Sequence, residues 1–308
     1  MSPSAEGPAK GRATRKSARP GTGKRSLRLA RAGAAGASSG SSLARMLSVI
    51  DVFTEEAPVW TVDDMASGLG YTRATTYRYV GELCNAGLLT RIAHGAYALG
   101  PRIIELDRQI QRGDPLLTVA QQVMQKLLRP DRGQVVLLCS LFREKVLCVQ
   151  QAGEDRALAV SYARGRPMPL FRGATAKAIL AWLPERRLTR LYLENQPEVQ
   201  EAGLGRTRDQ FLASLKAIRR QGHSITHGDV DPGVIGVAVP VFGEGGVMGS
   251  LSVVFPESRF PERQSLQVVS RLRQAADDIG AGLARLAQGP GPRRKNRPVP
   301  SRAVRAPG

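Results

Sequence analysis

Residues 72 to 78 bring together side chains that can form hydrogen bonds and ion pairs with nucleic acid. A helical projection centred on Val80 divides the segment from residue 74 to residue 84 into two faces. The buried stripe contains Thr76, Val80, Leu83 and Cys84. The opposite face contains Ala74, Thr75, Arg78 and Glu82. There, Arg78 can pair bidentately with guanine, Thr75 offers a hydroxyl and Ala74 allows close approach, so we predict that this helix reads bases in the major groove.

Four further side chains complete the predicted DNA contacts. Thr72 and Arg73 lie at the positive N-terminal end of the same helix, where phosphate contacts are favoured. Tyr77 lies on the flank of the helix, where contact with the DNA backbone and packing within the domain are equally open. His94, in a later turn, can enter a minor groove or touch phosphate, although a solvent-exposed turn histidine is the commoner case.

The surrounding pattern predicts the elements that position this helix. Apolar residues at helical spacing between residues 43 and 53 predict a first helix that ends near Glu55, Glu56 and Pro58. The sequence TVDD at residues 61–64 has the form of a capping box, which opens a short second helix, and Gly70 marks the turn after it. Thr72 is the candidate N-cap of the third helix, which should end near residue 85, before Gly87.

Two short strand-like runs at residues 88–90 and 97–99 flank His94 and Gly95, which is a hairpin signal. Three helices and this hairpin predict a winged helix-turn-helix domain over residues 42–100. The alternative is an ordinary small domain with a solvated helix. A net charge of −1 over residues 43–112 favours that alternative, because DNA-binding domains are usually basic. The ordered series of cap, turn, glycine stop and wing favours DNA binding.

The positive charge of the chain is concentrated at its two ends. The chain of 308 residues has a net charge of +19, of which residues 1–42 carry +8 and residues 289–308 carry +6. Residues 1–42 contain almost no large apolar side chains and residues 289–308 form a second basic run, so we expect disordered basic arms over residues 1–41 and 289–308. The N-terminal arm also has the acid-poor composition of an organelle transit peptide, but its scattered glycines and prolines spoil a helical apolar face.

Composition and motifs exclude several classes of protein. No apolar run approaches the roughly 18 to 20 residues of a membrane-spanning helix, so no membrane partner is expected. An odd count of three cysteines fits a reducing compartment, which indicates a cytoplasmic protein. Three histidines and the absence of zinc, P-loop and nucleophile-elbow motifs predict no metal, no cofactor and no enzymatic activity.

The rest of the chain predicts a linker and a mixed α/β domain. Pro101 suits the first turn of a linker helix over residues 101–114, and a second helix runs from Pro115 to about residue 128. Strands are predicted at residues 135–141, 146–150 and 158–162, and helices at residues 173–183, 185–193 and 207–221. A hairpin is predicted at residues 236–242 and 247–255, with a final helix from Pro261. The predicted fold class is α+β, with the mixed α/β domain over residues 115–288.

Three blocks in this order resemble the IclR-type bacterial transcription regulators. The first comprises SLARMLSVID at residues 42–51, TRATTYR at residues 72–78 and YALGP at residues 97–101. The second is GRPMPLFRGATAKAIL at residues 165–180. The third is RQGHSITHGDVDPG at residues 220–233, which continues through GVAVP at residues 236–240 to GSLS at residues 249–252. The resemblance covers residues 42 to about 286.

The resemblance implies a ligand-responsive repressor or activator that binds double-stranded operator DNA. It implies a GAF-like C-terminal domain, a six-stranded sheet flanked by helices, that binds a small-molecule effector. It also implies homodimers or homotetramers, in which the N-terminal domains pair through the first helix and the linker. It implies a protein that is associated with the bacterial nucleoid. The family's pocket positions fall on Gly173, Ala174, Thr226, Asp229, Gly236 and Ser252.

The predicted pocket has features that bear on its ligand. Gly173 and Ala174 would lie at a helix N-terminus, where unpaired N–H groups favour an anion such as the carboxylate of an organic acid. The family commonly has Glu at the position of Asp229, and Cys, Ser or Ala at that of Gly236, so this pocket is expected to be roomier at two points. Three nearby side chains could add positive charge: Arg166, Arg172 and His227.

Two other functions are consistent with the residues. In the first, an enzyme would transform an organic acid with Asp229 and either His227 or Cys148, although nucleophile, base and oxyanion donors are not jointly recognisable. In the second, Cys84, Cys139 and Cys148 would sense redox state. Apolar strand runs surround Cys139 and Cys148, and Cys84 faces the core of the third helix, so burial is the better interpretation.

Overall fold

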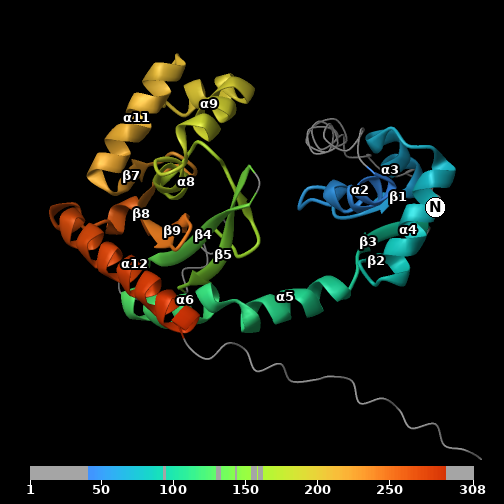
Figure 1. Ribbon diagram of the computed structural model, residues 1–308, viewed down its shortest axis with the longest axis horizontal. Coiled ribbons are helices and arrows are strands. Elements are labelled where there is room, and N and C mark those ends of the chain that lie inside the picture. Colours follow the sequence, from blue (N-terminus) through green and yellow to red (C-terminus); the bar gives the residue numbers. More distant parts are fainter. Residues whose placement is uncertain are drawn as a thin grey trace, which may run out of the picture. The chain divides into compact units, whose positions relative to one another are not determined.

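The computed structural model describes residues 41–92, 95–129, 133–142, 144–153, 158 and 162–288, which form two compact units that divide in sequence after Ile110 (Figure 1). The predicted arms, apart from Ser41, and His94 lie outside the described residues. No helix in the part of the chain that the structure describes is long and apolar enough to cross a membrane.

The first unit is a helix-turn-helix with a small antiparallel sheet. Its elements are α2 (Ser42–Leu47), the 3-10 helix η1 (Ile50–Val52), β1 (Trp60–Thr61), α3 (Val62–Leu69), α4 (Arg73–Asn85), β2 (Leu89–Arg91) and β3 (Ala96–Leu99). The sheet has the order β1-β3-β2, so β2 and β3 form the predicted hairpin. Local capping sets the helix starts: the Thr61 hydroxyl accepts the Asp64 N–H at 3.2 Å, and Gly70, with φ 71°, ends α3 in the left-handed region.

The prediction of one continuous first helix from residue 43 to near residue 55 is wrong. The helix α2 ends at Leu47, where the Ser48 hydroxyl donates to the Arg45 carbonyl at 2.8 Å and the chain tightens into η1. This break changes which side chains are buried: Val49 and Val52 enter the core, whereas Leu43 and Leu47 are 68% and 54% exposed. A serine hydroxyl that donates to a preceding backbone carbonyl competes with the backbone hydrogen bonds of a regular helix. The spacing of apolar residues gives no sign of this competition.

The second unit is built on a six-stranded sheet with the order β6-β5-β4-β9-β8-β7. Its helices begin with α5 (Arg102–Gly113), which spans the division between the units, and α6 (Pro115–Leu127), capped by Asp114. The strands are β4 (Val135–Phe142), β5 (Lys145–Ala152), β6 (Pro167–Met168), β7 (Ser224–His227), β8 (Val234–Gly243) and β9 (Gly246–Pro256). The remaining helices are α8 (Ala174–Leu180), α9 (Glu185–Glu194), α10 (Gln196–Glu201), α11 (Arg208–Gln221) and α12 (Ser265–Gln288).

Alternating side chains of the central strands divide the core into two layers. Val136 and Leu138 of β4 pack with α6 and α12 on one face of the sheet. Val135 and Leu137 of β4 pack with α8 on the other face, together with Val254 of β9. Figure 1 shows α12 along one side of the sheet and α8 on the other. The α+β fold class predicted from the sequence is confirmed.

The third predicted strand, residues 158–162, is not formed at its two described positions. Leu158 is helical and Tyr162 lies in a turn, whereas the residues between them lie outside the described part. On the side away from β4, β5 pairs with β6, in which Met168 lies opposite Val146. An apolar run alone does not distinguish a strand from another buried segment. The last helix also starts later than predicted, at Ser265, after the 3-10 turn Glu262–Gln264.

Candidate functional site

The helix α4 carries the predicted DNA-contacting residues, and its local geometry is set at its N-terminus. Thr72 caps the helix, because its hydroxyl accepts the Thr75 N–H at 3.2 Å and donates to the Thr75 hydroxyl at 2.9 Å. Ala74, Tyr77 and Arg78 are exposed. The hydroxyls of Thr72 and Thr75 are therefore bonded to each other. They lie at the edge of the predicted reading surface, which is the face of α4 that is expected to contact DNA.

The buried side of α4 differs from the helical projection at two positions. Thr76, Val80 and Leu83 are buried as predicted. Tyr79 is also buried, at 3% exposure, whereas Cys84 is only partly buried. The aromatic ring of Tyr79 reaches the core from a position that the projection left unassigned, because a long side chain covers more of the helix surface than its own angular position indicates.

Both arginines of the predicted reading surface are held by neighbours. Arg73 Nε lies 2.9 Å from Asp63 Oδ1, and its guanidinium lies over the Tyr77 ring, 5.6 Å from the centroid. A hydrogen bond with Tyr77 and the charge of Asp63 raise the pKa of Arg73. The Arg78 guanidinium lies over the Tyr79 ring at 5.5 Å. Asp63 therefore competes with phosphate for the Arg73 guanidinium.

In the second unit, five of the six predicted effector residues line one pocket. Gly173, Ala174, Thr226, Asp229 and Gly236 lie on its wall, and the cavity between the lining side chains has a volume of about 20 Å³, which is room for about one water molecule. Ser252 does not line the pocket. Its hydroxyl accepts a hydrogen bond from the lining residue Thr175 at 3.2 Å, so it orients the wall from behind.

The apolar part of the pocket wall comes from both the sheet and the loops around it. It contains Met168, Val230, Val234 and Val254. Tyr162 lies beside them, and burial together with the negative charge of Asp231 raises the pKa of its hydroxyl. The pocket therefore combines an apolar wall with a tyrosine that stays neutral.

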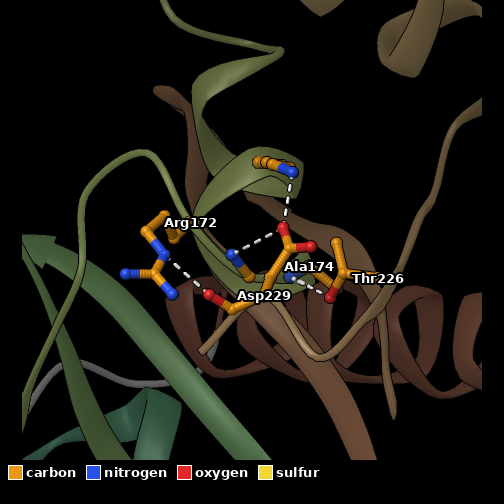
Figure 2. Close-up of polar contacts among 6 residues, drawn as sticks. Arg172, Ala174, Thr226 and Asp229 are labelled. Carbon is orange, nitrogen blue, oxygen red and sulfur yellow. Dashed lines mark hydrogen bonds and ion pairs between the residues drawn. The ribbon is translucent and has the colours of Figure 1, made fainter. Parts of the chain in front are cut away.

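Asp229 is the centre of the polar part of the pocket (Figure 2). Its Oδ2 accepts hydrogen bonds from Lys177 Nζ at 2.6 Å and from the Gly173 N–H at 3.3 Å. Its backbone carbonyl accepts a hydrogen bond from Arg172 Nε at 2.6 Å. The side chains of Lys177 and Asp229 are 13% and 25% exposed. Lys177 does not line the pocket, but it holds the carboxylate of Asp229, which does; it lies one helical turn after Gly173 and is not among the residues predicted from the sequence.

The expectation of unpaired N–H groups is wrong for Gly173 and Ala174 at the start of α8. The Gly173 N–H donates to Asp229, and the Ala174 N–H donates to Thr226 Oγ1 at 3.0 Å. Both acceptors come from β7 and the loop after it, more than fifty residues further along the chain. The pocket's own side chains therefore occupy the positions that we expected an anion to fill. Of the three cations considered, Arg172 lines the pocket, whereas Arg166 and His227 do not.

The geometry does not support the enzyme alternative. The Asp229 carboxylate is paired with Lys177, and the exposed His227 ring contacts Phe260 at 6.2 Å between centroids. Among the described residues no group of three His, Cys, Asp or Glu side chains could hold a metal ion. Cys139 and Cys148 lie opposite each other on β4 and β5, and both are fully buried, as expected.

Two family models match the chain. The model of the IclR helix-turn-helix domain matches residues 42–93, and that of the bacterial transcriptional regulator IclR C-terminal region matches residues 110–281. The chain belongs to the IclR family. Its relatives are transcriptional regulators, so this IclR-family chain is a DNA-binding regulator and not an enzyme.

Several curated and structural relatives resemble this IclR-family protein over most of their length. The regulator KipR of Bacillus subtilis is 24% identical over 241 residues, which cover 77% of this chain and 95% of KipR. XynR of Escherichia coli is 26% identical over 245 residues, or 79% and 96% of the two chains. A putative IclR regulator from Silicibacter sp. TM1040 has the same fold, with a TM-score of 0.67, 23% identity and coverage of 82% of this chain and 98% of that one.

One structural relative contains a ligand. It is an IclR homologue from Microbacterium hydrocarbonoxydans complexed with 4-hydroxybenzoate. The two chains are 24% identical, with a TM-score of 0.65 and coverage of 80% of this chain and all of the other. This similarity establishes a common fold.

Proposed function

We propose that this IclR-family regulator binds operator DNA as a homodimer or homotetramer in the cytoplasm, on the nucleoid, and that an organic acid in the α8 pocket changes operator binding. The observation that supports an acidic effector is the group of donors around Asp229. Lys177 Nζ, the Gly173 N–H and Arg172 Nε all point at this one residue. A ligand carboxylate can take the place of the Asp229 carboxylate on the first two donors.

The apolar wall favours an effector with a nonpolar body. Met168, Val234 and Val254 offer no charge to a ligand, and the neutral Tyr162 hydroxyl can form one hydrogen bond. The complex of a relative with 4-hydroxybenzoate, a carboxylate on an aromatic ring, is consistent with this chemistry. Gly236 leaves space for about one methyl group on the β8 side of the pocket, because a Cβ there would lie 3.4 Å from the Ala174 Cβ and 3.5 Å from Thr226 Oγ1.

For DNA recognition, we propose that Thr75 and Arg78 contact bases and that Thr72 and Arg73 contact phosphates, with Ala74 at the point of closest approach. Tyr77 orients Arg73, and His94 is proposed to contact the minor groove or phosphate. Effector binding would change the spacing between the two helix-turn-helix domains of a dimer, through the helices between residues 101 and 128. The new spacing would change how well the two domains fit the operator.

Two measurements test this function separately. A duplex site is selected from a random library with the full chain, and Arg78→Ala should weaken binding to it about 5- to 150-fold, with a smaller loss on scrambled DNA. Equal losses on both duplexes would contradict base reading by Arg78. Effector chemistry is tested by calorimetry with 4-hydroxybenzoate and its neutral amide. Binding of the acid alone, weakened by Lys177→Met, supports an organic acid, and equal binding of both would contradict it.

A further inference from the structure

Two tyrosines, Tyr71 and Tyr79, link α2, the first helix of the first unit, to α4 and the turn before it. The rings of Tyr71 and Tyr79 pack edge to face, with centroids 6.1 Å apart and an interplanar angle of 86°. Each hydroxyl is bonded to a serine near one end of α2. Tyr79 OH lies 3.1 Å from Ser42 Oγ, and Tyr71 OH lies 3.0 Å from Ser48 Oγ. The pair therefore connects both ends of α2 to the helix-turn-helix.

Each tyrosine ring also carries one arginine on its face. The Arg78 guanidinium lies 5.5 Å from the Tyr79 centroid, and the Arg45 guanidinium lies 5.9 Å from the Tyr71 centroid. The negative face of an aromatic ring attracts a cation and restricts the orientations of a long side chain. The two tyrosines thus have matching contacts, but only Tyr79 holds a residue of the predicted reading surface.

Tyr79 is itself fixed at both ends. Its ring is 3% exposed and packs in the core with Val80 and Leu83, whereas Arg78 next to it is exposed. The hydrogen bond with Ser42 and the positive charges of Arg45 and Arg78 lower the pKa of the Tyr79 hydroxyl. The bond to Ser42 limits rotation and tilt of the Tyr79 ring.

We propose that Tyr79 is a positioning residue for Arg78: Ser42 fixes the Tyr79 hydroxyl, and the ring holds the guanidinium in the orientation with which Arg78 reads its base. This inference rests on the proposed base contact of Arg78. An arginine has many rotamers in solution, and a side chain that is already restrained loses less conformational freedom when it binds DNA. The effect should therefore appear at the base pair that Arg78 reads and hardly at all on unspecific DNA.

The test compares Tyr79→Phe with Tyr71→Phe in the full chain. Both variants keep the ring and lose one hydroxyl bonded to a serine of the first-helix region, so a merely structural role would affect both alike. Affinity is measured on the duplex selected from a random library, on a scrambled duplex and on single-base-pair variants of the selected site. We expect Tyr79→Phe to weaken selected-site binding about three- to tenfold and scrambled binding less than about twofold. Tyr71→Phe should leave both within about twofold.

A double-mutant cycle assigns the loss to Arg78. Arg78→Ala identifies the base pair whose identity no longer matters, and adding Tyr79→Phe to it should cause no further loss. Ser42→Ala removes the same hydroxyl bond from an exposed position and should reproduce the Tyr79→Phe effect even if that variant folds poorly. Equal effects of Tyr79→Phe and Tyr71→Phe, or losses that multiply with Arg78→Ala, overturn the positioning role. An Arg78→Ala variant with full affinity overturns the base contact itself, and the inference with it.

Discussion

Lys177 Nζ lies 2.6 Å from Asp229 Oδ2 and connects α8 to the loop after β7 across 52 positions of sequence. Both side chains are mostly removed from solvent, at 13% and 25% exposure. The same carboxylate oxygen also accepts the Gly173 N–H. One internal ion pair thus fixes a carboxylate of the pocket wall, and the same carboxylate satisfies a backbone donor at the start of α8.

The first prediction concerns the stability that this ion pair contributes. Asp229→Asn leaves the Lys177 ammonium without its charged partner in a poorly solvated place, so unfolding of the second unit should become easier by about 1–3 kcal/mol. Urea unfolding followed by circular dichroism measures the change. The control is Glu144→Gln, which removes the half-exposed pair with Arg190 and should cost less than about 0.5 kcal/mol. Similar losses in both variants would show that the Lys177 pair is no more than a surface contact.

The second prediction distinguishes two glycines of the pocket wall. A Cβ on Gly236 would lie 3.4 Å from the Ala174 Cβ, an ordinary contact, so Gly236→Ala should fold normally and weaken effector binding by filling the pocket. Gly173 has φ 82°, and a Cβ there would lie 2.8 Å from Val230 Cγ2, so Gly173→Ala should destabilise the unit by about 1–3 kcal/mol. Thermal unfolding and calorimetry check both. A destabilised Gly236→Ala would contradict the assignment of that space to a ligand.

The third prediction is a pH dependence due to Tyr162. Burial and Asp231 raise the folded pKa of this hydroxyl above its unfolded value of about 10. The neutral form is favoured in the folded state, so the contribution to stability is complete below pH 10 and is lost as the pH rises above it. Urea midpoints between pH 8 and 11 should therefore fall less steeply in Tyr162→Phe than in the unmodified chain. Identical slopes would be inconsistent with the raised pKa.

The fourth prediction concerns the contact between Asp63 and Arg73. Asp63→Asn releases Arg73 for phosphate, so affinity for scrambled DNA at low salt should rise about two- to fivefold. Asp64→Asn is the matched control, because Asp64 carries the same charge in the same turn but accepts from the Thr61 hydroxyl at 2.7 Å. Fluorescence anisotropy of a labelled duplex measures both. Equal gains would show that net charge alone, and not release of Arg73, causes the effect.

The fifth prediction separates attraction to DNA from site preference. Residues 1–42 carry +8 and residues 289–308 carry +6, so removal of residues 1–40 and 289–308 should lower affinity for scrambled DNA and flatten its salt dependence. The ratio of selected-site to scrambled affinity should remain, because α4 lies outside the deleted segments. Titrations at several salt concentrations provide both quantities. Loss of the ratio would mean that the basic ends take part in site recognition.

Local patterns in the sequence are sufficient to predict the elements of much of the first unit. The capping box of Thr61 and Asp64, the left-handed Gly70 and the Thr72 cap each act within a few residues, so the sequence alone predicts where α3 and α4 begin and end. The same holds for the hairpin of β8 and β9, whose strands are joined by a tight turn. Even the break after Leu47 has a local cause in Ser48, although apolar spacing alone could not reveal it.

Patterns in the sequence thus predict the order and type of most elements and most of the residues that line the pocket. Which polar groups bond to one another depends on the folded chain. Asp229 pairs with Lys177, Thr226 accepts the Ala174 N–H, and Tyr79 bonds to Ser42 because the fold brings together segments between 37 and 52 residues apart. Capping and turn preferences act through neighbouring residues, whereas these contacts depend on how elements pack against one another, which no local pattern specifies.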